Sequence, residues 1–231
     1  MVQPESTPRT GRAVPGGVVT VRATAALADE IALRLTGSLN LRRTALRLLD
    51  LIKPGLADWA MLAIPDSRTG GLMLFGGEEP GYSVLVPRPA ANDLGLGRVL
   101  RTGQTELLHV AVGIEADDDG LTSLIPHLDL SAQVASRLPV DVLAVALTAG
   151  GSTLAALVVV RGGGYDDGDV AIAQRIADRA AIALDSARLY EERGLLAAAL
   201  QEAVRPPVLP DVDGLLPVSY THLTLPTTPY V

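Results

Sequence analysis

The sequence of 231 residues contains no cysteine, and its aromatic fraction is only 3%. Without thiols the chain cannot form disulfide bonds, thiolate zinc sites or cysteine-linked chromophores, which is consistent with a reducing compartment. Because rings are scarce, aliphatic side chains must fill the core, and a hydrophobic fraction of 48% is enough for one. The composition therefore predicts a packed globular domain with short extensions, or two small domains.

The chain also lacks an excess of basic residues and lacks long apolar runs. Its formal net charge is −7, which makes nucleic acid an improbable partner because phosphate binding requires a Lys/Arg surface. No apolar run reaches the roughly 18 residues of a membrane span, and the N-terminus has no apolar secretion signal. We therefore expect a cytoplasmic protein that binds no membrane, with a disordered leader at residues 1–20.

Two amphipathic helices are predicted near the start of the chain. Apolar residues recur every four positions from Leu27 through Ile31 to Leu35, which is typical of one helix face. Asn40 is a candidate N-cap for a second helix, and Pro54 with Gly55 is expected to end it.

Short apolar runs bounded by glycine and proline predict the strands. An antiparallel pair is expected at 58–66 and 70–77, and a hairpin is expected around Gly150 and Gly151. Asp166, Asp167 and Asp169 are suited to the start of a long final helix, which we expect to reach about Val204. The remaining expected segments are strands at 82–87 and 105–110, a helix near 94–100, and amphipathic pieces at 121–128 and 131–138. This order predicts an α+β fold with helices packed on an antiparallel sheet.

Three segments resemble a GAF domain, a small-molecule-sensing fold related to PAS. They are "TALRLLDLIKPGLADWAMLAIPD", "LGLGRVLRTGQTELLHV" and "YDDGDVAIAQRIADRAAIALDSARLYEER". The resemblance implies a GAF domain at 21–187, with five to six antiparallel strands flanked by helices. It also implies a long C-terminal signalling helix, including a dimerisation segment at 188–204, and a ligand pocket on the sheet face opposite the terminal helices.

The next segment, "LLAAALQEAVRPPVLPDVDGLLP" at 195–217, resembles the start of a SpoIIE-type (PP2C-like) serine/threonine phosphatase domain. The resemblance implies that 205–217 is the truncated start of that domain. Its catalytic part would bind two Mn²⁺ or Mg²⁺ ions through aspartates beyond Val231 and would act on a phosphoprotein. We expect no catalytic residue, cofactor or metal site within the chain itself.

The last residues, 218–231, differ in composition from the rest of the chain. Residues 218–227, "VSYTHLTLPT", resemble the conceptual translation of a transposase-type sequencing adapter. We therefore expect that 218–231 is an artefact and that the interpretable sequence ends at Pro217.

Four residues are candidates for lining the ligand pocket: Met61, Phe75, His109 and His127. A histidine in such a pocket is also a candidate haem ligand, although most lone histidines are structural. Cyclic GMP is disfavoured, because the signature of the GAF domains that bind it needs a lysine and a phenylalanine, and Lys53 is the single lysine. The acidic segment 115–120 begins like a calcium loop but has Pro126 where a glutamate is needed, so it is interpreted as a solvated loop.

The final helix carries a seam of mostly small apolar residues, which includes Ile176, Ala180, Ala183, Ala187 and Tyr190. Such a seam pairs with a second copy in a dimer, or packs on the sheet, and the pattern alone favours neither. We expect a homodimeric sensory GAF domain with an unknown small-molecule ligand, which regulates the phosphatase that would follow. The alternatives are a ligand-free dimerisation module and a haem-based gas or redox sensor.

Overall fold

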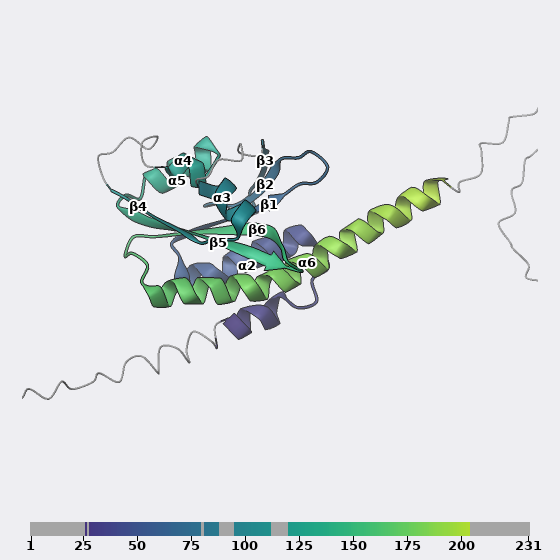
Figure 1. The fold of residues 1–231 in the computed structure, drawn as a ribbon, viewed down its shortest axis with the longest axis horizontal. Helices are drawn as coiled ribbons and strands as arrows, with labels where there is room; N and C mark the ends of the chain where they lie inside the picture. Colours follow the sequence, from purple (N-terminus) through teal and green to yellow (C-terminus); the bar gives the residue numbers. More distant parts are fainter. Residues whose placement is uncertain (1–25, 27, 80, 88–94, 112–119, 204–231) are drawn as a thin grey trace, which may run out of the picture. The chain divides into compact units, whose positions relative to one another are not determined.

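The computed structural model describes residues 26–203, except 27, 80, 88–94 and 112–119. The expected leader, most of the acidic segment 115–120 and everything from Val204 onward lie outside the described residues. The described chain forms one sheet with helices on both sides (Figure 1).

The sheet contains six antiparallel strands in the order β3-β2-β1-β6-β5-β4, which confirms the predicted fold class. The central strands β1, β5 and β6 are almost entirely buried, whereas the edge strands β3 and β4 are short and partly exposed. The strands are β1 Trp59–Pro65, β2 Leu72–Gly76, β3 Ser83–Val86, β4 Glu106–Val110, β5 Val140–Ala149 and β6 Ser152–Arg161.

Local chemistry builds the two tight turns of the sheet. Between β1 and β2, the Asp66 carboxylate accepts hydrogen bonds from the Arg68 backbone N–H (3.1 Å) and the Thr69 hydroxyl (2.9 Å). These bonds, the Arg68 N–H foremost, hold the pKa of Asp66 below its ordinary value. Between β5 and β6, Gly150 and Gly151 have φ values of 58° and 80°, which only glycine adopts readily. Both turns lie where the sequence predicts them.

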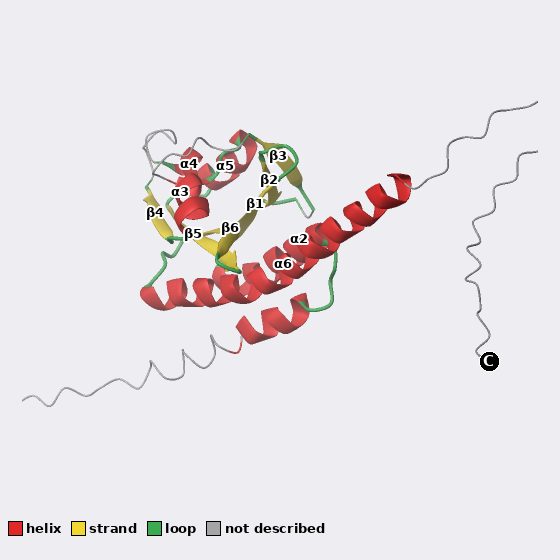
Figure 2. Ribbon diagram, turned by 45° about the vertical axis from the view of Figure 1, so that its right-hand side comes forward, coloured by secondary structure: helices red, strands yellow, loops and turns green. Residues whose placement is uncertain are grey.

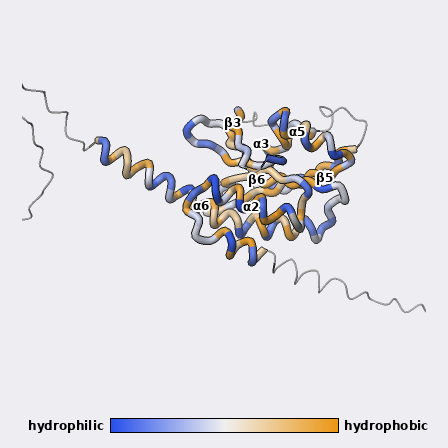
Figure 3. Tube along the Cα trace, turned by 180° about the vertical axis from the view of Figure 1, so that it is seen from behind, coloured by the Kyte–Doolittle hydropathy of each residue, from blue (hydrophilic) through white to orange (hydrophobic). Residues whose placement is uncertain are grey.

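One side of the sheet, the α6 side, is covered by α2 (Leu41–Leu56) and by residues 167–192 of α6 (Asp167–Ala203), and the helical residues 28–35 lie beneath these two helices, away from the sheet (Figure 2). Ile31, Leu35 and Leu48 are buried there in one hydrophobic cluster that also includes Leu62 and Leu157 of the sheet. In Figure 3 hydrophobic and hydrophilic residues alternate along α2 and α6, as expected of helices with one buried face.

Helix α2 begins as predicted but ends later. The Asn40 side chain accepts a hydrogen bond from the Arg43 backbone N–H at 2.8 Å, which is an N-cap. The expectation that Pro54 and Gly55 end the helix is wrong, since α2 continues to Leu56. A proline near the end of a helix removes only one of the last N–H donors, so the final turn persists.

The opposite side, the α3 side, is covered by α3 (Gly95–Thr102), α4 (Leu121–Leu124) and α5 (Leu128–Ala135). Leu96, Val99 and Leu130 are fully buried there against the sheet. The second predicted amphipathic piece, 131–138, corresponds to α5, which begins three residues earlier.

Helix α6 begins with a reciprocal pair of hydrogen bonds. Asp166 accepts from the Asp169 backbone N–H at 2.8 Å, and Asp169 accepts from the Asp166 backbone N–H at 3.2 Å. This capping box satisfies two backbone donors that the helix itself leaves free, and it explains the acidic start.

The chain divides into two compact units, residues 1–192 and 193–231. The part of α6 that belongs to the second unit, residues 193–203, is exposed throughout. In the ranges that the structure describes, no helix is sufficiently long and apolar to cross a membrane.

Candidate functional site

The two sides of the sheet separate the four predicted pocket residues. Met61 on β1 is fully buried on the α3 side, and His127 precedes α5 on that same side. Phe75 and His109 lie elsewhere. The four candidates therefore do not converge on one pocket.

Phe75 belongs to the core of the α6 side. It pairs with Leu62 across β1 and β2, and both side chains are buried in the cluster under α2 and α6. Leu72 and Leu74 occupy the α3 side of β2, so strand alternation directs Phe75 to the other face. Phe75 was expected in a pocket opposite the terminal helices, and the structure places its side chain on the side that α2 and α6 cover.

His109 lies on the edge strand β4, and its side chain is 70% exposed. Its neighbours Leu108 and Val110 pack on the α3 side, and the His109 Nδ1 atom contacts the Asp141 carboxylate on β5. His109 was expected to line the pocket, and the structure places its side chain on the side of the sheet away from α3.

His127 is the described histidine that does lie on the α3 side. Its Nδ1 atom is buried and has no hydrogen-bond partner among the described residues. The ring of Tyr82 lies beside it, with 6.2 Å between ring centroids and a tilt of 59°. A buried, unpaired nitrogen next to an aromatic ring can donate or accept one hydrogen bond, so His127 remains the strongest polar candidate for contacting a ligand.

A polar contact that the sequence did not reveal fixes α5 to the sheet. The Trp59 indole Nε1 donates to the Gln133 Oε1 atom at 2.9 Å, and the Glu78 backbone N–H donates to the same oxygen at 3.1 Å. A buried tryptophan needs an acceptor for its N–H, and this requirement is the signal that could have directed attention to Gln133. Trp59 itself is 1% exposed, and its ring belongs to the hydrophobic core of the α3 side.

The predicted seam on α6 is mostly occupied within the chain. Ile176, Ala180 and Ala187 are fully buried on the α6 side of the sheet, and Ala183 is partly buried. Tyr190 is 56% exposed. The seam therefore packs on the sheet, and most of it is not accessible to a second copy.

A different face of α6 carries two exposed apolar side chains among polar ones. Ile182 is 61% exposed and Leu189 is 39% exposed, seven residues apart. Ile182 also lines a groove of about 480 Å³ beside the helical residues 28–35. The groove is lined by Ala28, Asp29, Arg175, Asp178, Arg179 and Ile182, and Arg179 pairs with Asp29 at 3.3 Å.

A second groove, of about 430 Å³, lies along α2. It is lined by Asn40, Arg42, Arg43, Leu46, Arg47 and Asp50. Three arginines make this face basic in an otherwise acidic protein. The Arg42 Nη2 atom donates a hydrogen bond to the Gly81 carbonyl at 2.7 Å, so part of this guanidinium is already paired within the protein.

Metal-ligating side chains do not cluster in the described part of the chain: no group of three histidine, cysteine or acidic residues could hold an ion there. The acidic segment 115–120 lies outside that part, except for Gly120.

Comparisons with known proteins agree on the fold. The GAF domain profile matches residues 38–185. No curated protein matches the chain significantly. Among solved structures, the GAF domain of nlh2 from A. aeolicus, described as in an inactive state, has a TM-score of 0.54 at 12% identity and covers 72% of this chain and 98% of its own.

Two further structures are similar at the level of fold. The GAF domain of a phosphoenolpyruvate-protein phosphotransferase from Coxiella burnetii has a TM-score of 0.54 at 15% identity, with 73% of this chain and 96% of that chain covered. A fragment of a methyl-accepting chemotaxis protein has a TM-score of 0.52 at 14% identity, with 71% and 99% covered.

Proposed function

The chain belongs to the GAF domain family, and from this premise we propose that it is a cytoplasmic small-molecule sensor that regulates a C-terminal SpoIIE-type (PP2C-like) serine/threonine phosphatase. The observation that carries the proposal is the segment at 195–217, which follows the GAF match and resembles the start of that phosphatase. The phosphatase would bind Mn²⁺ or Mg²⁺ and act on a phosphoprotein.

The experiment for this part of the proposal begins with the native gene. We expect the reading frame after codon 217 to encode the metal-binding aspartates of the phosphatase instead of residues 218–231. The full-length protein should then dephosphorylate a phosphoserine or phosphothreonine protein only when Mn²⁺ or Mg²⁺ is present. A native frame without those aspartates would refute the link to the phosphatase.

We propose that the small molecule binds on the α3 side, next to His127 and Tyr82. A ligand at one hundred times its dissociation constant stabilises a fold by about 2.7 kcal/mol, which a thermal-shift screen of metabolites detects. His127→Ala should reduce the shift produced by a hit, whereas Leu107→Ala, which changes an exposed side chain on β4, should leave it unchanged. Equal loss in both variants would contradict this location. An absorption spectrum of the purified protein tests the haem alternative.

The second candidate function is a ligand-free dimerisation module. It is favoured by the close packing of the α3 side, where Met61, Leu72 and Leu74 are completely buried by the chain's own side chains. A screen that finds no stabilising metabolite, together with a stable dimer, would support this function over sensing.

We propose that the protein is a homodimer that pairs through the exposed face of α6 that carries Ile182 and Leu189. The spacing of seven residues recurs once more in the sequence at Leu196, which is 65% exposed, and a heptad repeat of apolar residues is typical of helices that pair with one another. Residues 193–203 of α6 are exposed throughout, and a second copy that packs against them would stabilise this part of the helix.

Light scattering during gel filtration tests the dimer. Ile182→Glu combined with Leu189→Glu should convert a dimer to a monomer, because the substitution places charges in the pairing face. Leu128→Glu is the matched control, since Leu128 is 80% exposed on α5, away from α6. A wild-type monomer at high concentration, or a dimer in the double variant, would refute the proposed interface.

A further inference from the structure

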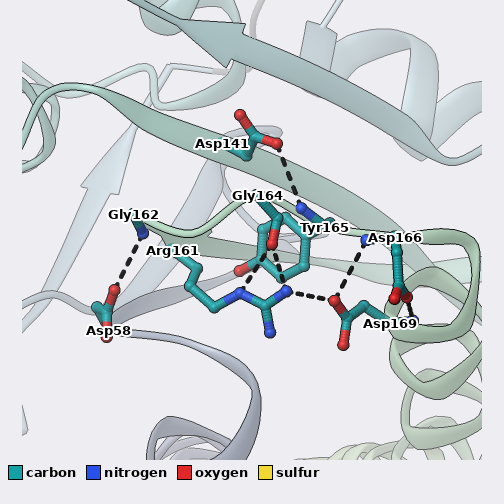
Figure 4. Close-up of polar contacts among 8 residues, drawn as sticks. All are labelled: Asp58, Asp141, Arg161, Gly162, Gly164, Tyr165, Asp166 and Asp169. Atoms are coloured by element: carbon teal, nitrogen blue, oxygen red, sulfur yellow. Dashed lines mark hydrogen bonds and ion pairs between the residues drawn. The ribbon is translucent and has the colours of Figure 1, made fainter.

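The corner between β6 and α6 is held by three aspartates from separate segments (Figure 4). Asp58, before β1, accepts a hydrogen bond from the Gly162 backbone N–H at 3.1 Å. Asp141, on β5, accepts from the Tyr165 backbone N–H at 3.3 Å. Asp169, in the first turn of α6, accepts from the Asp166 backbone N–H. The backbone N–H groups of Gly162, Tyr165 and Asp166 are therefore each paired with a carboxylate from another position in the chain.

Arg161 joins the corner to the helix. Its Nε atom donates to the Gly164 carbonyl at 2.9 Å, and its Nη2 atom contacts the Asp169 carboxylate. The guanidinium also lies 4.6 Å from the ring centre of Tyr165, within the range of a cation–π interaction. Because the Arg161 and Asp169 side chains are only 27% and 21% exposed, this ion pair is better shielded from solvent than a surface pair.

Asp141 makes a second contact, with the edge strand β4. Its Oδ2 atom accepts the hydrogen bond from the Tyr165 N–H, and its Oδ1 atom contacts the Nδ1 atom of His109 on β4. The Asp141 side chain is 14% exposed, so both contacts are made by a largely buried carboxylate. One side chain thus touches the edge strand of the sheet and the residue that leads into α6.

The side chains of strand β4 alternate between the two sides of the sheet. Leu108 and Val110 pack in the α3-side cluster, and His109 between them contacts Asp141 on the other side. A shift of β4 relative to β5 that accompanies repacking on the α3 side would therefore also move His109 relative to the Asp141 carboxylate that it contacts.

We propose that Asp141 couples the position of β4 to the first turn of α6, through His109 on one oxygen and Tyr165, Arg161 and Asp169 beyond the other. The coupling is a property of the fold, and its use in signalling rests on the proposed sensory function. It provides a route by which a change on the α3 side reaches the first turn of α6, a helix whose buried residues lie in the cluster on the other side of the sheet.

Amide hydrogen exchange on the full chain without ligand tests the coupling. In His109→Ala, the amides of residues 165–170 should exchange about fivefold faster or more, which is the lower range of typical coupling between sites. His109 contacts none of these amides, so a purely local role predicts no change there. The matched control is Leu107→Ala, which removes an exposed side chain from the same face of the same strand.

Reciprocity provides a second readout. Asp169→Asn should also accelerate exchange of the β4 amides, since a coupling between two sites acts in both directions. In the double variant of His109→Ala and Asp169→Asn, the increase in exchange rate should be smaller than the product of the increases in the two single variants. Amides at the centre of the β5–β6 hairpin report on global stability and should keep their wild-type rates.

Three results would overturn the coupling: exchange that accelerates only within β4 in His109→Ala, an equal effect of Leu107→Ala, or effects that multiply independently in the double variant. None of these measurements involves a ligand, a phosphatase or a dimer. Failure of the coupling would therefore leave the proposed function standing, and a failed metabolite screen would leave the coupling standing.

Discussion

At the scale of single residues, Tyr165 combines burial with an unpaired polar atom. The residue is 9% exposed, and its hydroxyl has no hydrogen-bond partner among the described residues. A buried polar group without a partner costs about 1–3 kcal/mol. Burial also raises the pKa of the Tyr165 phenol above its ordinary value, because the phenolate would lose hydration.

Tyr165→Phe should therefore unfold with an unchanged free energy or one raised by about 1 kcal/mol, since the substitution keeps the ring against Arg161 and removes only the unpaired hydroxyl. Denaturant titration measures this quantity. Tyr190→Phe, at an exposed position, is the control and should have no effect. A loss of stability in Tyr165→Phe would reveal a hydrogen-bond partner for the hydroxyl.

The same residue predicts a dependence on pH. The unfolded chain releases the tyrosine proton near pH 10, while the folded state retains it because its pKa is raised. The unfolded state then binds fewer protons, so the stability contributed by Tyr165 is present below about pH 10 and is lost as the pH rises further. Wild type should lose more stability than Tyr165→Phe between about pH 9 and pH 11.

Gly95 illustrates a second requirement at this scale. Its φ is +65°, and a Cβ atom there would lie 2.4 Å from the Ser123 Oγ atom and 2.6 Å from the Ser123 carbonyl oxygen. Gly95→Ala should lower the free energy of unfolding by about 2 kcal/mol or more, through backbone strain and displacement of α4. Gly194→Ala is the matched control, since nothing lies within 4 Å of that position, and it should not destabilise. Equal effects would contradict the steric explanation.

At the scale of elements, the start of α6 depends on its capping box. Asp166→Ala removes the acceptor for the Asp169 N–H and should cost about 1 kcal/mol in thermal or chemical denaturation. Asp166→Asn retains a capping oxygen and should restore most of that loss. If the asparagine variant is as unstable as the alanine variant, the negative charge and not the hydrogen bond is responsible.

The elements that local chemistry defines were predictable from sequence. The Gly150–Gly151 hairpin, the Asp66 turn and the Asn40 cap each depend on residues within a few positions, so their signals are complete in the sequence. Pro54 was misleading because its effect depends on how near the helix end it lies, and the helix end is set by packing on the sheet.

The candidate site was less predictable, because the side of the sheet on which a strand residue lies depends on how that strand pairs with distant strands. In "TELLHV" two leucines are adjacent, so alternation alone cannot decide whether Leu107 or Leu108 is buried, and the face of His109 follows from that choice. Similarly, the apolar seam of α6 shows which helix face is buried, but it does not show whether the sheet or a second copy packs against that face. The contact between Trp59 and Gln133 joins residues 74 positions apart and leaves no local pattern.

At the scale of the whole molecule, the sheet separates two aliphatic clusters that share β1. Met61 and Leu62 are adjacent and completely buried, but Met61 packs on the α3 side and Leu62 on the α6 side. Truncation of either to alanine should cost about 2–5 kcal/mol. The two losses of stability arise in different clusters, so neighbouring substitutions in one strand can be used to compare the two sides of the sheet.

The single tryptophan makes this comparison measurable. Trp59 lies in the α3-side cluster with Met61, so Met61→Ala should shift its fluorescence emission, whereas Leu62→Ala should leave the emission of the folded state unchanged. A shift of equal size in both variants would mean that the sheet transmits packing changes freely between its sides.

The strand order has a consequence for how the chain reaches this structure. Strands β1, β2 and β3 form one meander and β4, β5 and β6 form another, and the two join only where β1 pairs with β6. That pairing brings together Trp59 and Val160, about a hundred residues apart, so it carries the largest loop-closure entropy in the sheet. Each meander can form from strands that are neighbours in sequence, whereas the pairing of β1 with β6 should form more slowly. During synthesis on the ribosome the first meander would emerge with its β1 edge unprotected, and this interval is when the nascent chain is most exposed to aggregation.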